Sequence, residues 1–239
     1  MQSPYFYNVP HYPYQGHAKW LKRYEKLPYP RNLYAAFLST MDEYIGKLLA
    51  KVNALGLRED TIVIFQSDHG HSHEERAHRS GGNSGPYRGA KFSLFEGGIR
   101  VPAIISWPGT LPAGQVLGQV GHGCDWLPTI AALCGAPLLQ KNIDGRSLES
   151  LVRGQTKQSP HDVLHWTFGN SWAVRDGEWK LIANPRDTSL RGKIPKGTKR
   201  WLSKLDRDVT EMKNFAAEHP EVVKRLEALH SKWARSVPK

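Results

Sequence analysis

The chain contains 239 residues, of which 39% are hydrophobic, so it is long and apolar enough to bury a core as one large domain or two small ones. Its 33 lysine and arginine residues outnumber 22 acidic residues, and the net charge of +11 favours polyanionic partners such as nucleic acid, anionic glycans or sulfate esters without bearing on the fold. Two cysteines exclude a disulfide framework, and the lack of any run of about 18 apolar residues excludes a membrane-spanning helix.

The N-terminal residues predict a short aromatic strand that ends in a proline-locked turn. The segment from Pro4 to Pro13 is rich in tyrosine, and Pro10 and Pro13 fix φ and keep the residues before them extended. His11 is therefore expected at the exit of a strand. From the residues alone, an exposed structural histidine is the favoured interpretation of His11.

The clearest helix pattern lies between Tyr34 and Leu55. Apolar residues recur there at three- and four-residue steps, and Gly56 stands where a C-terminal capping glycine belongs. The helix would lead through a short turn into the run Thr61–Phe65, as in half of a right-handed βαβ unit. Because this run is β-branched and aromatic without polar alternation, it predicts a strand buried on both faces of a parallel sheet.

The stretch after this strand concentrates the ionisable side chains. Asp68 and His69 follow directly, at the position where open α/β sheets place their ligands. Further histidines include His73 and His78, but a zinc-protease helix needs its two histidines four residues apart, and these are five apart. Zinc-protease chemistry is therefore not expected.

A second apolar strand is expected from Val101 to Trp107, followed by a turn-rich loop and two helices. Asp125 is the expected cap of a helix from Trp126 to Leu133, and a shorter helix opens after Asp144 and ends near Gly154. Both cysteines are interpreted as buried small hydrophobic side chains.

The last third of the chain predicts a small antiparallel sheet and a terminal helix. Alternating apolar and polar residues flank Asp176-Gly177, which is a strong hairpin signal. A basic loop runs from Arg186 to Arg207, and an amphipathic helix begins at Pro220. A solvated loop is the favoured interpretation of the basic stretch, with a groove for polyanions as the alternative.

Two motifs and a tail carry a resemblance to a known family. The motifs are Ser67-Asp68-His69-Gly70 after a strand, and Gly89-Ala90-Lys91 followed by Glu96-Gly97-Gly98-Ile99-Arg100-Val101-Pro102; the tail has Leu205, Glu211 and Asn214. Together they resemble the C-terminal half of the active site of the sulfatases, the sulfate-ester hydrolases of the alkaline-phosphatase superfamily. The turn at His11 is similar to the family's strand that ends in a sulfate-contacting histidine.

The resemblance spans the chain from Pro4 to Trp233 and implies an α/β fold. Residues 1–160 would form the C-terminal part of an alkaline-phosphatase-like sulfatase core, a partial and mostly parallel sheet flanked by helices. Residues 161–239 would form a C-terminal subdomain with an antiparallel hairpin, the basic loop and the terminal helix.

The resemblance also implies roles for four residues. Asp68 and His69 would bind a divalent metal, usually calcium in this family, although a histidine nitrogen suits a hard cation less well than the oxygen of the family's common asparagine. Lys91 and His11 would be catalytic and substrate-binding: Lys91 would bind a sulfate oxygen and steady the leaving group, and His11 would contact the sulfate or protonate the departing alcohol. Glu96 and Arg100 are expected to form an internal pair that supports the motif.

The family's nucleophile is a formylglycine made from a Cys/Ser-x-Pro/Ala-x-Arg motif, which neither cysteine of this sequence provides. Cys134-Gly135-Ala136 comes nearest, but the arginine is missing and Cys134 ends a helix pattern, whereas an anion-facing nucleophile belongs at a helix start. Met1 is not followed by a signal peptide. The expectation is a C-terminal portion of a sulfatase, inactive alone, whose missing N-terminal part supplies the nucleophile, further metal ligands and the leader of a periplasmic or secreted protein.

Three functions remain open from the sequence. The first is hydrolysis of aryl or carbohydrate sulfates, with a sulfated small molecule or carbohydrate as substrate and no specific nucleic acid as partner. The second is a phosphate or phosphonate ester hydrolase of the same superfamily. The third is a non-catalytic polyanion-binding protein that uses the basic loop.

Overall fold

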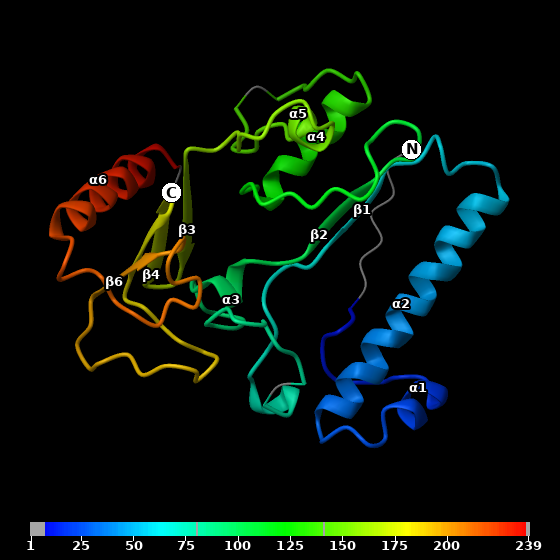
Figure 1. Cartoon of the computed structure of the whole chain (residues 1–239), viewed down its shortest axis with the longest axis horizontal. Helices are drawn as coiled ribbons and strands as arrows, with labels where there is room; N and C mark the ends of the chain where they lie inside the picture. The colour runs from blue at the N-terminus through cyan, green and yellow to red at the C-terminus, as the bar shows by residue number, and fades with distance from the viewer. Residues whose placement is uncertain (1–7, 80, 141, 238–239) are drawn as a thin grey trace.

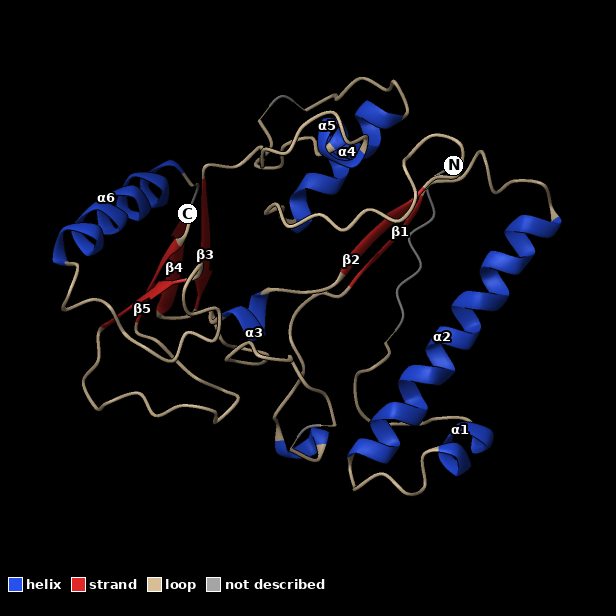
Figure 2. Ribbon diagram, in the orientation of Figure 1, coloured by secondary structure: helices blue, strands red, loops and turns tan. Residues whose placement is uncertain are grey.

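The computed structural model describes residues 8–79, 81–140 and 142–237 and has an α/β architecture with two separate sheets (Figure 1, Figure 2). One sheet pairs strand β1 (Val63–Gln66) with β2 (Ala103–Ser106), and the other has the strand order β3-β4-β5-β6. The short helix α3 (Glu96–Ile99) lies between the two sheets (Figure 1). The α/β class expected from the sequence is therefore present.

The two central strands pair antiparallel. Val63 lies opposite Ser106 and Gln66 opposite Ala103. Strand β1 was expected to have a parallel neighbour, and β2 is not that neighbour. The expectation that β1 is buried on both faces is wrong, because β1 is half-buried and Ile104 on β2 is 60% exposed. An apolar run without alternation shows that both faces of a strand carry apolar side chains, but it does not encode the direction of the neighbouring strand.

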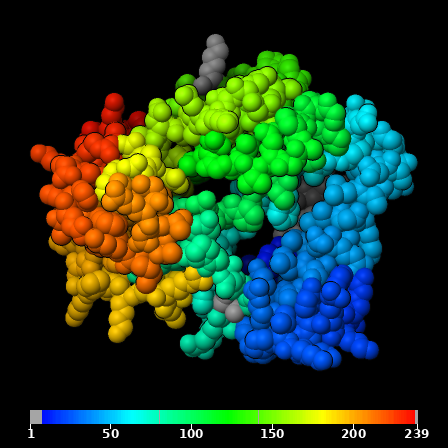
Figure 3. All heavy atoms as spheres, viewed as in Figure 1, coloured from blue at the N-terminus to red at the C-terminus, as the bar shows by residue number. Residues whose placement is uncertain are grey.

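Helix α2 (Arg31–Ala54) confirms the predicted helix, and Gly56 has the left-handed φ of +68° expected after a helix end. The shorter helix α1 (Ala18–Arg23) packs on it through the backbone N–H of His17, which donates to Thr40 Oγ1 at 2.9 Å. The space-filling view shows a hollow between α2 and the central segment (Figure 3). The strand predicted from Pro4 falls mainly on residues 1–7, outside the described residues, and residues 9–13 form turns.

Helices α4 (Trp126–Leu133) and α5 (Glu149–Val152) were both predicted, and they pack against Ile62, which directly precedes β1, and Ile105 of β2. The predicted role of Asp125 is wrong, because its buried carboxylate does not cap α4. It accepts hydrogen bonds from His122 N at 2.7 Å and Arg146 N at 2.8 Å and lies 2.8 Å from His161 Nε2, so it ties three loops together around the 3₁₀ turn η2 (Gly123–Asp125).

Both cysteines are exposed, which corrects their interpretation as buried hydrophobic side chains. Cys124 lies in η2, and Cys134 is the residue that ends α4. Each stands where the chain turns away from the packed face of a helix, and composition gives no signal for that position.

The C-terminal sheet is antiparallel, as predicted, with strands β3 (Val163–Phe168), β4 (Ser171–Asp176), β5 (Trp179–Ala183) and β6 (Arg200–Lys204). Asp176 pairs with Trp179, which confirms the hairpin, and Gly177 has a φ of +58°. Strand β6 lies inside the segment expected to be a basic loop. Its centre, Trp201 and Leu202, is buried, so the cationic residues at its two ends concealed an apolar strand.

Helix α6 (Pro220–Ser236) begins at the predicted proline and packs on β4 and β5, where Leu226 is fully buried against Val174 and Leu181. Two histidines stack on tryptophans at this contact. His230 stacks on Trp172 with ring centroids 4.1 Å apart, and His165 stacks on Trp233 at 4.8 Å.

The buried Nδ1 atoms of His165 and His230 have no hydrogen-bond partner in the described part of the chain. Burial lowers the pKa of His165 to about 4, and it also lowers the pKa of His230. The contact between α6 and the sheet is therefore built for two neutral imidazoles.

We expect the chain to lose stability as the pH falls from about 6.5 to about 4. In the unfolded chain His165 is protonated near its ordinary pKa, whereas in the folded chain it stays neutral down to a lower pH. The unfolded state therefore binds more protons in this window, so the free energy of unfolding falls as the pH is lowered. Urea unfolding at a series of pH values measures the slope. A His165→Phe, His230→Phe double variant should flatten it, whereas the exposed control His17→Phe should not; equal slopes in the double variant and the parent would contradict the assignment.

Candidate active site

The two motifs at the centre of the sequence are joined through their backbones. Gly70 N donates to Gly98 O at 3.0 Å, and Lys91 N donates to His71 O at 2.8 Å. A Cβ on Gly70 would lie 1.9 Å from Gly97 O, so the close approach requires glycine at this position. The turn that carries Asp68 and His69 therefore lies directly beside the loop that carries Lys91.

Asp68 and His69 contact each other on an exposed turn, where their side chains are 81% and 40% exposed. His69 Nδ1 lies 2.8 Å from Gly70 O, which can only accept, so Nδ1 carries a proton and the neutral ring has its lone pair on Nε2. That Nε2 is 3.1 Å from Asp68 Oδ2. In that tautomer both facing atoms carry lone pairs, so the pair suits a proton between them or one side of a divalent cation.

The pair does not form a complete metal site. Across the residues that the structure describes, no group of three or more histidine, cysteine, aspartate or glutamate side chains is arranged to hold a metal ion. Asp68 and His69 thus provide two ligands, and a stable divalent site needs more.

Lys91 is mostly buried, with a side chain 13% exposed, and its Nζ lies 3.2 Å from Glu74 Oε2. Glu74 also accepts from Arg76 Nη2 at 2.8 Å and from Ser72 Oγ at 3.1 Å. Hydrogen bonds from Arg76 and Lys91 lower the pKa of Glu74 to about 2, so this carboxylate stays ionised and fixes the lysine. Glu74 was not identified from the sequence, where the segment from His73 to His78 was compared only with the zinc-protease pattern.

His11 lies apart from the other three predicted residues. It is exposed, and its Nδ1 is 2.8 Å from the carbonyl of Tyr12. No hydrogen bond or ion pair within the described ranges joins it to Asp68, His69 or Lys91. The neighbouring residue Tyr12 links this turn to the site, because the guanidinium of Arg76, which donates to Glu74, lies 5.0 Å from the centroid of the Tyr12 ring.

The second motif is anchored by a buried ionic cluster made of Glu96, Lys180 and Glu211. Lys180 Nζ lies 2.8 Å from Glu96 Oε1 and 2.9 Å from Glu211 Oε1, and the three residues are at most 2% exposed. Glu211 Oε2 also accepts from Glu96 N at the start of α3. The cluster links the motif helix to β5 and to the C-terminal tail.

The two carboxylates of this cluster differ in their surroundings. Burial alone would raise the pKa of Glu96, but Lys180 and two neighbouring arginines lower it. One of these is Arg100 at 3.7 Å, so the predicted internal pair is present. Burial raises the pKa of Glu211. Lys180 was missed because one lysine in an alternating strand looks like a solvent-facing residue.

A family model described as Sulfatase matches residues 5–136, which is more than half of the chain. The chain is 40% identical over 153 residues to steryl-sulfatase of Mus musculus, covering 61% of this chain and 24% of the relative. It is 35% identical over 176 residues to arylsulfatase A of Homo sapiens, covering 71% of this chain and 33% of the relative. The chain thus spans about a quarter to a third of the length of these relatives.

Solved structures extend the likeness to nearly the whole chain. The crystal structure of Ps i-CgsB has a TM-score of 0.79 at 24% identity and covers 95% of this chain and 48% of that one, which establishes similarity of fold. The PsFucS1 sulfatase from Pseudoalteromonas sp. has a TM-score of 0.64 at 25% identity and covers 84% of this chain and 42% of that one.

Proposed function

Since this chain belongs to the sulfatase family, we propose that its segment from Asp68 to Lys91 forms one side of an active site that hydrolyses sulfate esters. The family and the α/β sulfatase fold expected from the sequence are confirmed. The observation that carries the proposal is the pair of backbone hydrogen bonds, Gly70 to Gly98 and Lys91 to His71, which joins the loop of Lys91 to the segment that follows Asp68 and His69.

Lys91 is proposed to stabilise the charge that develops as the S–O bond breaks. A transferring sulfuryl group, like a phosphoryl group, spreads negative charge over its oxygens, so fixed cations around it supply much of the catalysis. One of the three N–H donors of the ammonium is directed to Glu74, which leaves two for a sulfate oxygen and the bridging oxygen. Glu74 thus positions the lysine before substrate arrives.

Asp68 and His69 are proposed to hold a divalent ion, with calcium favoured by the carboxylate and by the family. When bound, the ion would polarise a sulfate oxygen as a Lewis acid. Asp68 supplies the hard oxygen ligand, and the hydrogen bond from His69 Nδ1 to Gly70 O keeps Nε2 available as the second ligand.

His11 is proposed to contact the sulfate or to protonate the departing alcohol. Its Nδ1 is held on the Tyr12 carbonyl, which leaves Nε2 as the nitrogen that exchanges a proton. The support for this role is the resemblance of its turn to the family, since in the structure His11 stands apart from Lys91.

The nucleophile is proposed to be a formylglycine encoded outside residues 1–239. Neither cysteine stands in a Cys/Ser-x-Pro/Ala-x-Arg motif. Two serine stretches, 84–88 and 171–175, fit the pattern, but the first lies in a loop and the second in strand β4, whereas an anion-facing nucleophile belongs at a helix start. The aligned relatives are also three to four times as long as the matched part, as follows from coverages of 33% and 24%. We therefore expect no turnover from the 239-residue chain alone.

The substrates proposed are aryl or carbohydrate sulfates, and the setting proposed for the whole protein is periplasmic or secreted. The relatives are named as steryl-sulfatase, arylsulfatase and N-acetylgalactosamine-6-sulfatase, so the names support sulfate esters as a class without selecting one alcohol. None of the helices in the described residues has the length and apolar character needed to cross a membrane.

The test compares the 239-residue chain with a longer chain that carries the nucleophile motif and has been matured by a formylglycine-generating enzyme. Both are assayed with 4-nitrophenyl sulfate and 4-nitrophenyl phosphate. We expect sulfate hydrolysis by the longer chain only. Faster hydrolysis of the phosphate would favour the phosphate-ester hydrolase, and salt-dependent heparin binding without any turnover would favour the polyanion-binding protein.

For the metal, we expect the 239-residue chain to bind calcium weakly, with a Kd of about 1 mM or above, because two ligands leave most of the coordination sphere to water. Titration calorimetry measures the affinity. Asp68→Ala should abolish the heat of binding, whereas the control Asp60→Ala, in the exposed turn before β1, should leave it unchanged. Tight binding that persists in Asp68→Ala would contradict the assignment.

A further inference from the structure

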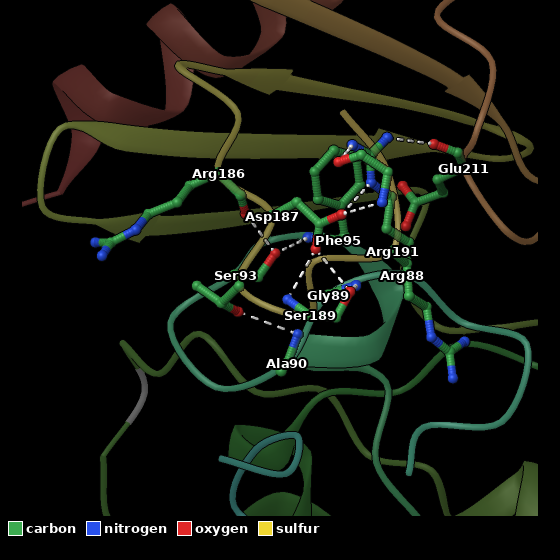
Figure 4. Close-up of polar contacts among 12 residues, drawn as sticks. Arg88, Gly89, Ala90, Ser93, Phe95, Arg186, Asp187, Ser189, Arg191 and Glu211 are labelled. Carbon is green, nitrogen blue, oxygen red and sulfur yellow. Dashed lines mark hydrogen bonds and ion pairs between the residues drawn. The ribbon is translucent and has the colours of Figure 1, made fainter. Parts of the chain in front are cut away.

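The segment at residues 186–192, called the strap below, was expected to be a solvated part of the basic loop. In the structure it lies against the loop that carries Lys91 (Figure 4). Ser189 Oγ accepts from Gly89 N at 3.0 Å, and Thr188 Oγ1 accepts from Ala90 N at 3.2 Å. The two amides that immediately precede Lys91 therefore find their acceptors on the strap.

The strap also contacts the residues that follow Lys91. Ser93 Oγ donates to the carbonyl of Arg186 at 2.7 Å and accepts from Phe95 N at 3.2 Å. Figure 4 shows the bond between Ser93 and Arg186 near those made by Gly89 and Ala90. Lys91 thus sits in a short turn whose two ends are both bonded to the strap.

Arg88 anchors this contact from within the core. It is 1% exposed, and its Nε lies 2.7 Å from Asp187 Oδ2 on the strap. Its Nη2 donates to Gly192 O at 3.1 Å, at the far end of the strap. The guanidinium also lies over the rings of Phe95 and Trp201, at 4.3 and 4.5 Å from their centroids.

Asp187 is held as an ion at this anchor. Burial would raise its pKa, but hydrogen bonds from Ser189, Arg88 and Gly192 together lower it. The carboxylate therefore binds Arg88 with one oxygen and fixes the Ser189 side chain with the other, at 2.7 Å. The Asp187 carboxylate thus fixes both Arg88 and the Ser189 hydroxyl group, which accepts the hydrogen bond from Gly89 N.

The turn needs such external contacts because its backbone is strained. Gly89 has a φ of +91°, and a Cβ there would lie 2.7 Å from Ser93 Oγ. Phe92, which has a side chain, nevertheless has a φ of +72°. Glycine adopts such a φ freely, but a residue with a large side chain keeps a left-handed conformation only where surrounding contacts determine it, and Phe92 directly follows Lys91.

We propose that Thr188 and Ser189 of the strap are positioning residues that set the place of Lys91 in the sulfate site. This rests on the function proposed for Lys91. Small displacements of a catalytic group lower turnover steeply, so a loosened turn would reduce kcat while the ammonium itself is retained. The strap therefore acts on the turn of Lys91 through these two hydroxyl groups.

The first test measures amide exchange by NMR in the 239-residue chain with Thr188→Val, which keeps the shape but removes the acceptor. We expect Ala90 N–H to exchange roughly tenfold faster, as for the loss of one hydrogen bond, with the amides of β5 unchanged. Thr188→Ser should restore protection. The control Thr198→Val removes a hydroxyl farther along the basic segment, which donates to Pro195 O, and should have no effect on Ala90. Unchanged exchange at Ala90 in Thr188→Val would overturn the inference.

The second test uses the longer, matured chain. Thr188→Val should lower kcat on the order of tenfold with KM little changed, and it should have no further effect in a Lys91→Ala background, because the residue acts through the lysine. An equal loss with and without Lys91 would overturn the inference by showing a general structural role. Failure of the unsubstituted longer chain to hydrolyse sulfate esters would instead overturn the proposed function and the positioning role with it, and the exchange result on the turn would stand.

Discussion

Replacing Lys180 by methionine is expected to destabilise the chain by about 3–5 kcal/mol, as when one partner of a buried ion pair is removed. Glu96 keeps Arg100 and Arg175 within 4 Å, but Glu211 is fully buried and loses the ammonium 2.9 Å away. Methionine fills the space without supplying charge. A loss of this size is a large share of the stability of an ordinary domain.

Urea unfolding of Lys180→Met at neutral pH measures the effect. Lys213→Met is the matched control, since Lys213 pairs with Glu218 at 2.9 Å with its side chain 55% exposed, and such surface pairs contribute about 0–1 kcal/mol. Adding Glu211→Gln to Lys180→Met should recover part of the loss by removing the buried charge. A loss no larger than that of Lys213→Met would show that the cluster is not a stabilising core element.

The variant should also change how stability depends on pH. Without Lys180, the buried carboxyl group of Glu211 favours its protonated form, so the folded state binds more protons than the unfolded state. Stability should then fall as the pH rises through the range in which the unfolded carboxyl groups lose their protons. The Lys180→Met deficit is expected to be smaller at pH 5 than at pH 8.

Lys91→Ala in the longer, matured chain is expected to lower kcat on the order of 10²–10³-fold, the usual effect of removing one fixed donor to a developing negative charge. The ammonium is matched to the bridging oxygen only as the S–O bond breaks, so the loss should appear in kcat more than in KM. Poor leaving groups depend more on this charge. The penalty should therefore be larger for an alkyl sulfate than for 4-nitrophenyl sulfate.

Steady-state kinetics on both substrates measure this effect. Two exposed lysines of the basic segment, Lys196 and Lys199, provide a matched control, and their double alanine variant should change KM for polyanionic substrates only. Glu74→Gln should lower kcat less than Lys91→Ala, because it loosens the lysine without removing it. Unchanged kcat in Lys91→Ala would exclude the catalytic role of this residue.

Elements whose signals are local could be predicted from the sequence. Helices α2, α4 and α6 and the hairpin at Asp176-Gly177 follow from periodicity, from glycine and from proline, all of which act within a few residues. Candidate site residues could also be named from the sequence, because Asp68 and His69 are neighbours in the chain and Lys91 lies within a long motif, and their roles stay predictions. Family membership followed from the same contiguous residues.

The roles of the buried charged residues depend on contacts between positions that are distant in the sequence. Lys180 and Glu96 are 84 positions apart, and Glu96 N meets Glu211 across 115 positions, yet these contacts make the burial of all three residues possible. Arg88 and Asp187 are 99 positions apart and turn part of a basic loop into a support for Lys91. Burying a charged side chain costs free energy unless an oppositely charged or hydrogen-bonding partner is also present. A partner that is distant in the sequence does not change the local pattern of apolar and polar residues, so it cannot be predicted from that pattern. For the same reason, the direction of β2 beside β1 and the strand β6 emerged only when the chain was folded.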